Sequence, residues 1–337
     1  MNRWGPLVTR ARGLSGHLLA PQTLRSLAGA FDERAFVDAL VRIGYLAFPP
    51  NHPPPDARAV EGAIRRVAAR RFLVLARWSR DCDDVLVPLL DDEDRRSIRA
   101  LVRGALGGLA PEVRTLGLIP TAALPARALD ELALLNDAGA VGAALLALRH
   151  PFAHAVAEAA RIERPDLFAL DQAVAQAWAR RATAAARHGD DALRTYVARM
   201  IDLQNLWAAR LASEQRVDAP APALFIPGGA LISADDIAVA IETQNPEQLV
   251  QRLRARVAGT PLAVALTSHD RSPDEAAAQA LLDEMHTRSI ADPLGLAPVL
   301  LYVMRLRAEH RALTRLLWQL SLGVPPAVRV HDVEAAA

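Results

Sequence analysis

The chain has 337 residues, of which 52% are hydrophobic and 23% charged, and its formal net charge is +1. This length supports two or three domain-sized units with hydrophobic cores, and the near-neutral charge argues against a nucleic-acid partner. All 39 basic residues are arginine and Cys82 is the single cysteine, which excludes a Walker A lysine, a Schiff-base lysine and an internal disulfide.

The composition favours helix throughout the chain. Aromatic residues make up only 4%, and the abundance of alanine and leucine predicts an all-α protein. The longest apolar runs, such as residues 138–148, are too short to span a membrane, and no signal-peptide core follows the N-terminal arginines. We therefore expect a soluble, cytoplasmic protein.

Four helical patterns recur along the chain in the same order: two short helices and then two long ones. The short helices are predicted at 18–30, 117–133 and 224–240, and at 36–47, 141–153 and 249–263. The long helices are predicted, as antiparallel pairs, at 59–78, 170–187 and 276–291, and at 92–102, 202–212 and 309–319. Asp94, Asp202 and Glu309 align at separations of 108 and 107 residues, with Ile98, Leu206 and Leu313 four positions later.

This repetition divides the chain into three similar helical segments of about 107 residues, namely 1–118, 119–225 and 226–337. Three copies of one unit predict a pseudo-threefold object with a concave middle. The linkers fit the division, since residues 49–56 are rich in proline and residues 214–229 separate the second segment from the third. The alternative is that helices rich in Ala, Leu and Arg align easily without being true repeats.

The last long helix is predicted over residues 292–326. Asp292 is a good N-cap, Pro293 suits the first helical position, and Gly323 can take the left-handed stop. Pro298 would kink the helix. A buried seam that requires a partner helix is formed by Val299, Val303, Leu306, His310, Leu313, Leu317 and Leu320.

Motifs spread along the chain resemble those of one family. The last segment carries Pro293, Gly295, Pro298, Val299, Leu300, Tyr302, Glu309, Arg311 and Leu313, and the middle segment carries Asp202, Asn205 and Leu206. The N-terminus carries Arg10, Arg12, Gly13, Leu14, Leu18 and Leu19, and the end carries Gly323, Val324, Pro325 and Pro326. Together they resemble the C subunit of bacterial and archaeal V/A-type rotary ATPases, whose counterpart in eukaryotic V-type pumps is the d subunit. The sequence departs from the family pattern at Ser97 and Ala312, where the motif has Asn, and at Arg307, where an acid is usual.

The resemblance implies a funnel of three helical domains that sits on the membrane proteolipid ring and receives the foot of the central stalk. Its role would be torque transmission, without catalytic activity, cofactor or metal of its own. The protein would lie in the cytoplasm, peripheral to the inner membrane and not inserted in it, with the stalk subunits and the ring as partners.

Eight repeat-motif positions are the candidate site residues: Asp94, Ile98, Asp202, Asn205, Leu206, Glu309, Arg311 and Leu313. One interpretation places the acids Asp202 and Glu309 at a contact with stalk or ring. The other makes them links between repeats, with Asn205 bonding to a loop carbonyl. We favour the second, because buried polar groups in helical packing are usually satisfied locally.

Other polar residues have simpler explanations. The row Arg96, Arg99 and Arg103 is typical of a solvated face, with docking of an acidic partner as the less favoured interpretation, and the preceding acids 91–94 suit a helix N-terminus. His150 and His154 have the spacing of a metal pair, but Pro151 intervenes and no third ligand is evident. The tryptophans are interpreted as core or inter-domain anchors: Trp178, Trp207 and Trp318.

Two other functions stay open on the sequence alone. The first is an all-α enzyme of the terpene or prenyl synthase type, supported by acids that could bind Mg²⁺ and diphosphate: Asp81, Asp83, Asp84, Asp91, Asp92 and Asp94. A second metal motif and an aromatic cavity, which such an enzyme needs, are not visible. The second is a generic helical scaffold with a different partner.

Overall fold

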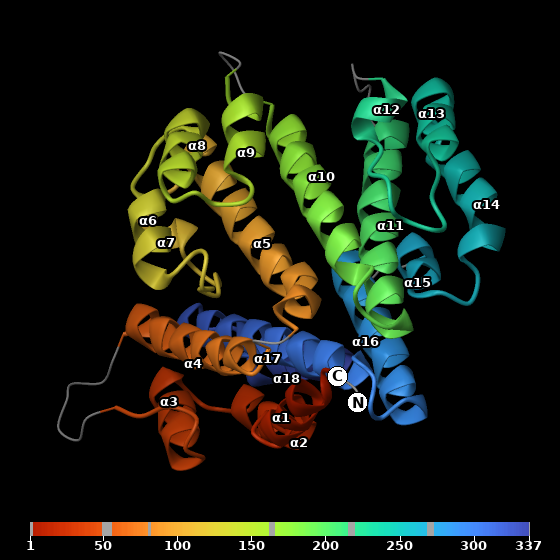
Figure 1. Cartoon of the computed structure of the whole chain (residues 1–337). Helices are drawn as coiled ribbons and strands as arrows, with labels where there is room; N and C mark the ends of the chain where they lie inside the picture. The colour runs from red at the N-terminus through yellow and green to blue at the C-terminus, as the bar shows by residue number, and fades with distance from the viewer. Residues whose placement is uncertain are drawn as a thin grey trace.

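The computed structural model describes residues 3–48, 56–79, 82–161, 166–214, 220–267 and 273–336. Within these ranges the chain is built from helices and has no β-strand, so the all-α prediction is confirmed (Figure 1). Parts of the predicted linkers, at 49–55 and 215–219, lie outside the described residues, as does Asp81.

The helices of the first segment are α1 (Gly5–Ser15), α2 (Pro21–Ala28), α3 (Glu33–Arg42), α4 (Ala57–Arg77), the 3₁₀ turn η1 (Asp83–Leu86), α5 (Val87–Leu106) and α6 (Pro111–Arg114). Those of the second are α7 (Ala126–Ala133), α8 (Ala138–Ala147), α9 (Ala153–Ala159), α10 (Leu167–Ala186), α11 (Asp191–Glu214) and α12 (Ala221–Leu224). Those of the third are α13 (Ala234–Thr243), α14 (Pro246–Val257), α15 (Pro261–Thr267), α16 (Pro273–Ala291), α17 (Ala297–Ser321) and α18 (Pro326–Ala336).

Local sequence explains where many helices begin. The side chains of Asp32, Asp56 and Asp137 accept hydrogen bonds from backbone N–H groups of the first turns of α3, α4 and α8. Ser233 and Asp236 form a reciprocal capping box at the start of α13. Such caps satisfy donors that have no partner inside the helix, and their residue types are apparent in the sequence.

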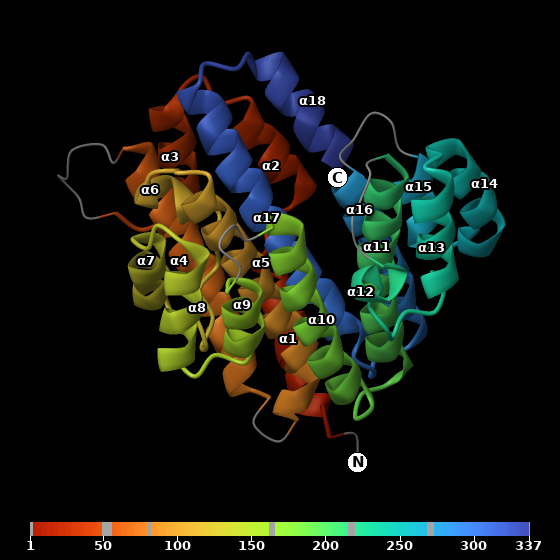
Figure 2. The same ribbon diagram turned by 90° about the horizontal axis from the view of Figure 1, so that it is seen from above.

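The short helices of each segment pack on the long helix that ends the preceding segment. Helices α7 and α8 lie on α5, α13 and α14 lie on α11, and α2 and α3 lie on α17. The main neighbour of α4 is α17 and that of α5 is α10, so the antiparallel pair predicted for the first segment is not formed; α10 with α11 and α16 with α17 do pack together. The N-terminal helices therefore close the arrangement against the C-terminal ones (Figure 2).

The hydrophobic core consists of three clusters that follow this packing. One lies within α11 to α16 and a second, larger one joins α1, α4 and α5 to α10 and the first half of α17. The third combines Leu27, Phe36 and Ile64 of the N-terminal helices with Leu313 and Leu317 of α17. The two sets are separated by more than 240 residues in the sequence. The boundaries 1–118, 119–225 and 226–337, and the pseudo-threefold funnel, remain predictions about repetition.

Helix α17 differs from the prediction at its beginning. It starts at Ala297, not near Asp292. Pro298 lies in its first turn, where the backbone N–H groups have no hydrogen-bond acceptor inside the helix, so the missing N–H of proline costs nothing and causes no kink. Asp292 instead accepts from the N–H groups of Leu294 and Gly295 in the preceding turn. At the other end Gly323 has φ +70°, as predicted for the stop. The predicted seam is buried, with Leu313 fully enclosed.

Candidate functional site

The three aligned acids Asp94, Asp202 and Glu309 lie on the long helices α5, α11 and α17. All three are buried, at 2%, 0% and 4% exposed. Each accepts hydrogen bonds from the loop that leads into the first short helix of the next segment. For Glu309 the next segment is the first one, because the packing closes on itself.

On α5, Asp94 holds the loop before α7. Its Oδ1 accepts from the hydroxyl of Thr121 at 2.5 Å, and Thr121 Oγ1 accepts from the N–H of Leu124 at 3.0 Å. His150 Nδ1 accepts from the N–H of Phe152 at 3.1 Å, so the ring proton sits on Nε2 and points to Asp94 Oδ2 at 3.3 Å. Both ring nitrogens of His150 are therefore engaged, and the exposed His154 does not join it in a metal site.

On α11, Asp202 and Asn205 hold the loop before α13. Asp202 accepts from three consecutive N–H groups, those of Ala230 (3.1 Å), Leu231 (2.9 Å) and Ile232 (3.1 Å). Burial raises the pKa of Asp202, and these three donors oppose the rise. Asn205 exchanges two bonds of 2.8 Å with the backbone of Ile226, which is the loop bond expected from the local interpretation.

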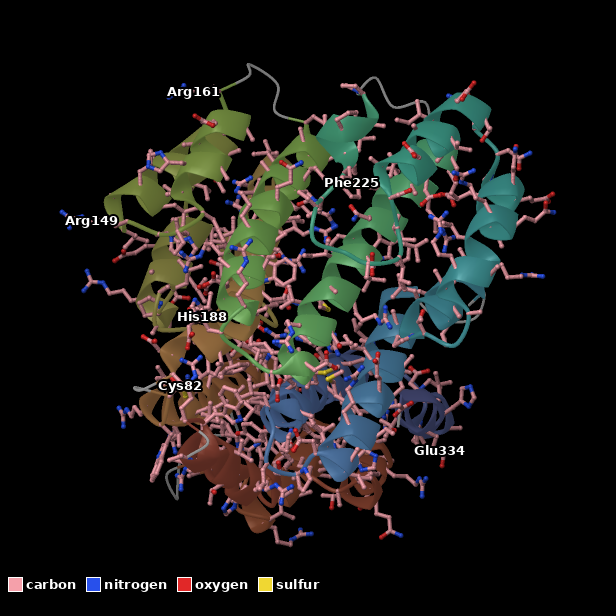
Figure 3. The ribbon with its side chains drawn as sticks, turned by 45° about the vertical axis from the view of Figure 1, so that its right-hand side comes forward. Cys82, Arg149, Arg161, His188, Phe225 and Glu334 are labelled. Atoms are coloured by element: carbon pink, nitrogen blue, oxygen red, sulfur yellow. The ribbon has the colours of Figure 1, made fainter. Side chains whose placement is uncertain are left out.

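Steric constraints explain why this loop has glycine at positions 228 and 229. Gly228 has φ +113°, a conformation that side chains rarely adopt, and a Cβ on Gly229 would collide with Asp202 Oδ1. From the other side, Gln172 and Gln176 of α10 donate to the backbone carbonyls of Leu224, the last residue of α12, and of Phe225, the first residue after it. Figure 3 labels Phe225. The loop is thus fixed between α10 and α11.

On α17, Glu309 holds the segment before α2. Its Oε2 accepts from the N–H of Leu19 at 2.5 Å, and its Oε1 from Arg71 Nη1 of α4 at 2.5 Å. Arg71 also donates to the carbonyl of His17 at 2.7 Å. The carboxylate therefore joins the C-terminal helix to both α4 and the N-terminal segment. Among the other predicted positions, Ile98, Leu206 and Leu313 are fully buried one turn beyond the acids, whereas Arg311 is exposed.

We expect Asp202→Asn to lower the free energy of unfolding by about 1–3 kcal/mol. The amide keeps one oxygen but turns an NH₂ group toward backbone N–H donors, so at least one buried donor loses its acceptor. Urea unfolding followed by circular dichroism measures the change. Asp38→Asn, at an exposed position of α3, is the matched control. Equal stability of the two variants would show that Asp202 does not hold the loop.

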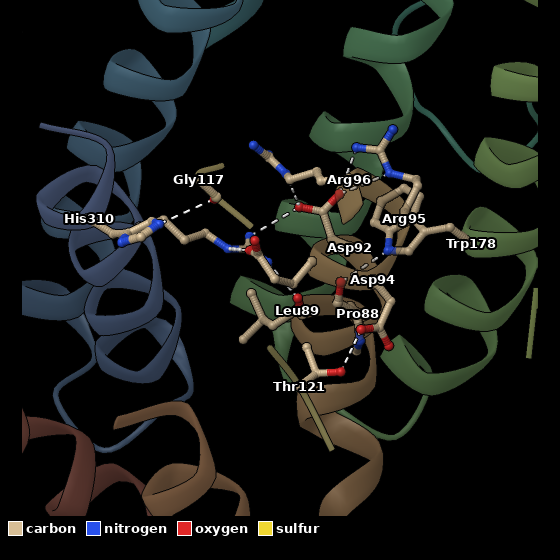
Figure 4. A network of polar contacts seen from close by, with 12 residues as sticks. Pro88, Leu89, Asp92, Asp94, Arg95, Arg96, Gly117, Thr121, Trp178 and His310 are labelled. Carbon is tan, nitrogen blue, oxygen red and sulfur yellow. Dashed lines mark hydrogen bonds and ion pairs between the residues drawn. The ribbon is translucent and has the colours of Figure 1, made fainter. Parts of the chain in front are cut away.

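A second buried cluster joins α5 to α17 and α11 (Figure 4). The predicted N-terminal acids 91–94 lie in the second turn of a helix that already begins at Val87, and all four are buried. Asp92 accepts from Arg95 at 2.6 Å, from Arg96 at 3.0 Å and from Arg307 of α17 at 3.1 Å. Their assignment to a helix N-terminus is therefore corrected: Asp92 is held by arginines of α5 itself and by Arg307 of α17, not by the helix dipole.

Arg307 is the principal connection in this cluster. It donates to Glu93 Oε2 at 2.8 Å and to the carbonyl of Leu89 at 2.5 Å, in addition to Asp92. Burial alone would raise the pKa of Asp92, but Arg96, Arg95 and Arg307 hold it well below its usual range. Burial by itself would lower the pKa of Arg307, but the carboxylates of Glu93 and Asp92 raise it above its usual value. Both groups are therefore ionised at neutral pH.

Two other acids proposed for an enzyme site are also paired with arginine. Asp91 bonds to Arg181 at 2.6 Å and Asp84 to Arg3 at 3.1 Å. No group of three or more potential metal ligands gathers in the part of the chain that the structure describes. The terpene or prenyl synthase interpretation therefore has no support in this geometry. In the basic row, Arg99 and Arg103 both pair with Asp171 of α10, so it is not simply solvated.

Two buried arginines, Arg114 and Arg329, escaped the sequence analysis. Arg114 donates to the carbonyls of Leu109, Ala133 and Leu135, which brings the end of α7 to α6. Arg329 donates in the same manner to the carbonyls of Ala28, Ala30 and Val324. A signal was present, because each arginine follows a left-handed glycine by six residues, Gly108 and Gly323, with a proline between.

The tryptophans differ in their surroundings. Trp178 is fully buried, donates to the carbonyl of Pro88 at 3.0 Å and carries Arg95 over its ring, so it anchors α10 to the start of α5. Trp207 and Trp318 are half-buried on α11 and α17.

Comparison with known proteins gives a consistent result. A model of the ATP synthase (C/AC39) subunit family matches residues 7–328. The C subunits of the A-type ATP synthases of two Halobacterium salinarum strains are each 26% identical over 262 residues, covering 74% of this chain and 74% of the relative. Within the described ranges, no helix has the length and apolar character needed to traverse a lipid bilayer.

Proposed function

The chain belongs to the ATP synthase (C/AC39) subunit family, and on this premise we propose that it is a non-catalytic subunit in the central stalk of a V/A-type rotary ATPase. It links the rotor shaft to the membrane proteolipid ring and transmits torque between them. ATP turnover in the catalytic head is thereby coupled to proton or sodium transport. The protein then lies peripheral to the membrane, on the cytoplasmic side.

The observation that carries this proposal is the closure of the three helical segments on one another. Asp94, Asp202 and Glu309 each join a long helix to the next segment, and the contact of Glu309 with Leu19 and Arg71 joins the last helix to the first ones. A body that passes torque must not open at a seam under load. Buried, charge-assisted hydrogen bonds at each junction resist such opening better than exposed contacts do.

The arrangement of the long helices supports a socket. Helices α5, α11 and α17 meet at the cluster around Asp92, through Arg307 and through the bond of Arg95 to Gln204 at 3.2 Å. From that meeting point their C-terminal ends diverge (Figures 1 and 2). We infer that the shaft enters between the diverging ends.

Reconstitution tests the proposal. The purified chain should bind both the shaft subunits and the proteolipid ring of the same complex, and adding it to a complex that lacks it should restore ATP-driven ion transport in liposomes. Binding to neither partner, or full transport without this chain, would refute the proposed role. Rotary ATPase subunit genes adjacent to its own gene would be a quick supporting observation.

We expect the isolated chain neither to bind nor to hydrolyse ATP. It has no lysine and no glycine-rich phosphate loop, and the acids of its central cluster are paired with arginine rather than available for Mg²⁺. Isothermal titration with MgATP should give no saturable heat at concentrations up to about 1 mM, the upper end of ordinary substrate affinities. Saturable binding at micromolar ATP would contradict the non-catalytic assignment.

A further inference from the structure

A small pocket lies against α17 where that helix meets the loop before α7. Its volume is about 250 Å³, and we call it the α17 pocket; it is lined by Gly117, His310, Arg311, Thr314, Arg315 and Trp318. The pocket lies between α17 and the loop that contains Gly117. The N–H of Gly117 donates to Glu61 of α4 at 2.8 Å, and the carbonyl of Gly117 lies 3.2 Å from His310 Nε2. The loop that forms one wall is therefore fixed in position.

The α17 pocket has unused hydrogen-bonding capacity. His310 Nδ1, Thr314 Oγ1 and Trp318 Nε1 are buried and have no hydrogen-bond partner in the described part of the chain. The three residues are spaced by four along α17 and so share one helix face. Because His310 Nε2 donates to the carbonyl of Gly117, His310 Nδ1 is an acceptor, whereas Thr314 and Trp318 offer donors. Nearly all buried polar atoms in folded proteins are bonded, so the two donors in this pocket wall indicate a place for a bound acceptor group.

The charge of the pocket lining indicates the charge of the group that could bind there. Its lining contains two arginines and no acid, and Arg311 and Arg315 are exposed at its rim. The surface that a partner meets at this pocket therefore carries positive charge, which favours an acidic partner.

We propose that the α17 pocket receives a carboxylate side chain from an acidic segment of the central-shaft subunits. This inference rests on the proposed function and adds the chemistry of the contact. Guanidinium groups bind carboxylates through charge-assisted, often paired hydrogen bonds. Arg311 and Arg315 make the first contact at the rim, and the deeper Trp318 N–H and Thr314 hydroxyl donate to the carboxylate as it enters.

The test is titration of the purified shaft subunits into the full chain at ionic strengths of about 0.05 M and about 0.15 M. For the double variant Arg311→Ala/Arg315→Ala we expect affinity to fall about tenfold or more, with a weaker dependence on salt. Trp318→Phe keeps an aromatic ring but removes the indole donor, and should weaken binding by about threefold or more. Thermal unfolding of both variants separates a loss of binding from a loss of the folded state.

Two matched controls lie outside the pocket. Arg127→Ala removes an arginine whose side chain is 90% exposed on α7, and Trp207→Phe removes another buried indole N–H that has no partner in the described residues. Both should bind the shaft as the wild type does.

Four results would overturn the proposal. If the wild type binds the shaft and the pocket variants bind it equally well, the contact lies elsewhere, although the proposed function survives. If the variants lose the proteolipid ring instead of the shaft, or if inorganic phosphate alone occupies the pocket and does not compete with the shaft, the assigned occupant is wrong. If the wild type binds neither shaft nor ring, the proposed function fails, and this inference with it.

Discussion

Replacing Arg307 by methionine is expected to lower the free energy of unfolding by about 3–5 kcal/mol, the usual cost of removing one partner of a buried ion pair. Methionine fills similar space but leaves Glu93 buried without its cation and the carbonyl of Leu89 without its donor. Asp92 keeps Arg95 and Arg96. The loss should therefore come mainly from Glu93 and from the separation of α17 from α5.

Denaturant unfolding of Arg307→Met measures this effect, and Arg305→Met, at an exposed position of the same helix, is the control. The control should change stability by no more than about 0.5 kcal/mol. The double variant Glu93→Leu/Arg307→Met removes both charges and should recover much of the loss, because apolar replacement of a whole buried pair is often neutral. If Arg307→Met proves as stable as Arg305→Met, the cluster does not hold the two helices together.

The same cluster gives a dependence on pH. Arginines hold the folded-state pKa of Asp92 below its unfolded value, so its stabilising contribution is present above the unfolded pKa of about 3.9 and is lost as the pH falls toward the depressed folded value. Burial raises the pKa values of Asp202 and Glu61, so these two groups affect stability in the opposite direction. Protonating them as the pH falls removes the free-energy cost of keeping a buried carboxylate charged. Wild type should therefore lose more stability than Arg307→Met between about pH 5 and about pH 3.

Truncating Leu313 to alanine is expected to cost about 2–5 kcal/mol, the range for large-to-small changes in a closed core. Leu313 is 0% exposed and lies in the cluster that joins α2, α3 and α4 to the second half of α17. The cavity would loosen the contact that closes the last segment on the first. Under the proposed function, an assembled complex carrying Leu313→Ala should hydrolyse more ATP for each ion transported.

Leu322→Ala is the matched control, since Leu322 follows the end of α17 and is 79% exposed. It should leave both stability and coupling close to wild type. Thermal unfolding measures the stability, and the ratio of ATP hydrolysis to ion transport in proteoliposomes measures the coupling. Unchanged values for Leu313→Ala in both assays would contradict the mechanical role of this junction.

The sequence by itself determined the class of the protein. Composition and helical periodicity are local properties, so they were sufficient for the all-α class and for the stop at Gly323. The sequence also singled out Asp94, Asp202 and Glu309 by their spacing, and each of these carboxylates accepts a hydrogen bond from a loop or segment before a short helix. That the three segments are repeats stays a prediction.

Only the tertiary structure decided which charges are buried and which helices are neighbours. Nothing local to residues 91–94 indicates that Arg307, more than 200 residues away, pairs with Asp92 and Glu93 inside the protein. The start of α17 was misplaced for a similar reason. The Asp292 carboxylate is used by its own turn, and Asp190 from another loop accepts the N–H of Leu296 at 2.6 Å. Capping rules describe what a residue can do locally, whereas the partner that it meets depends on how distant segments pack.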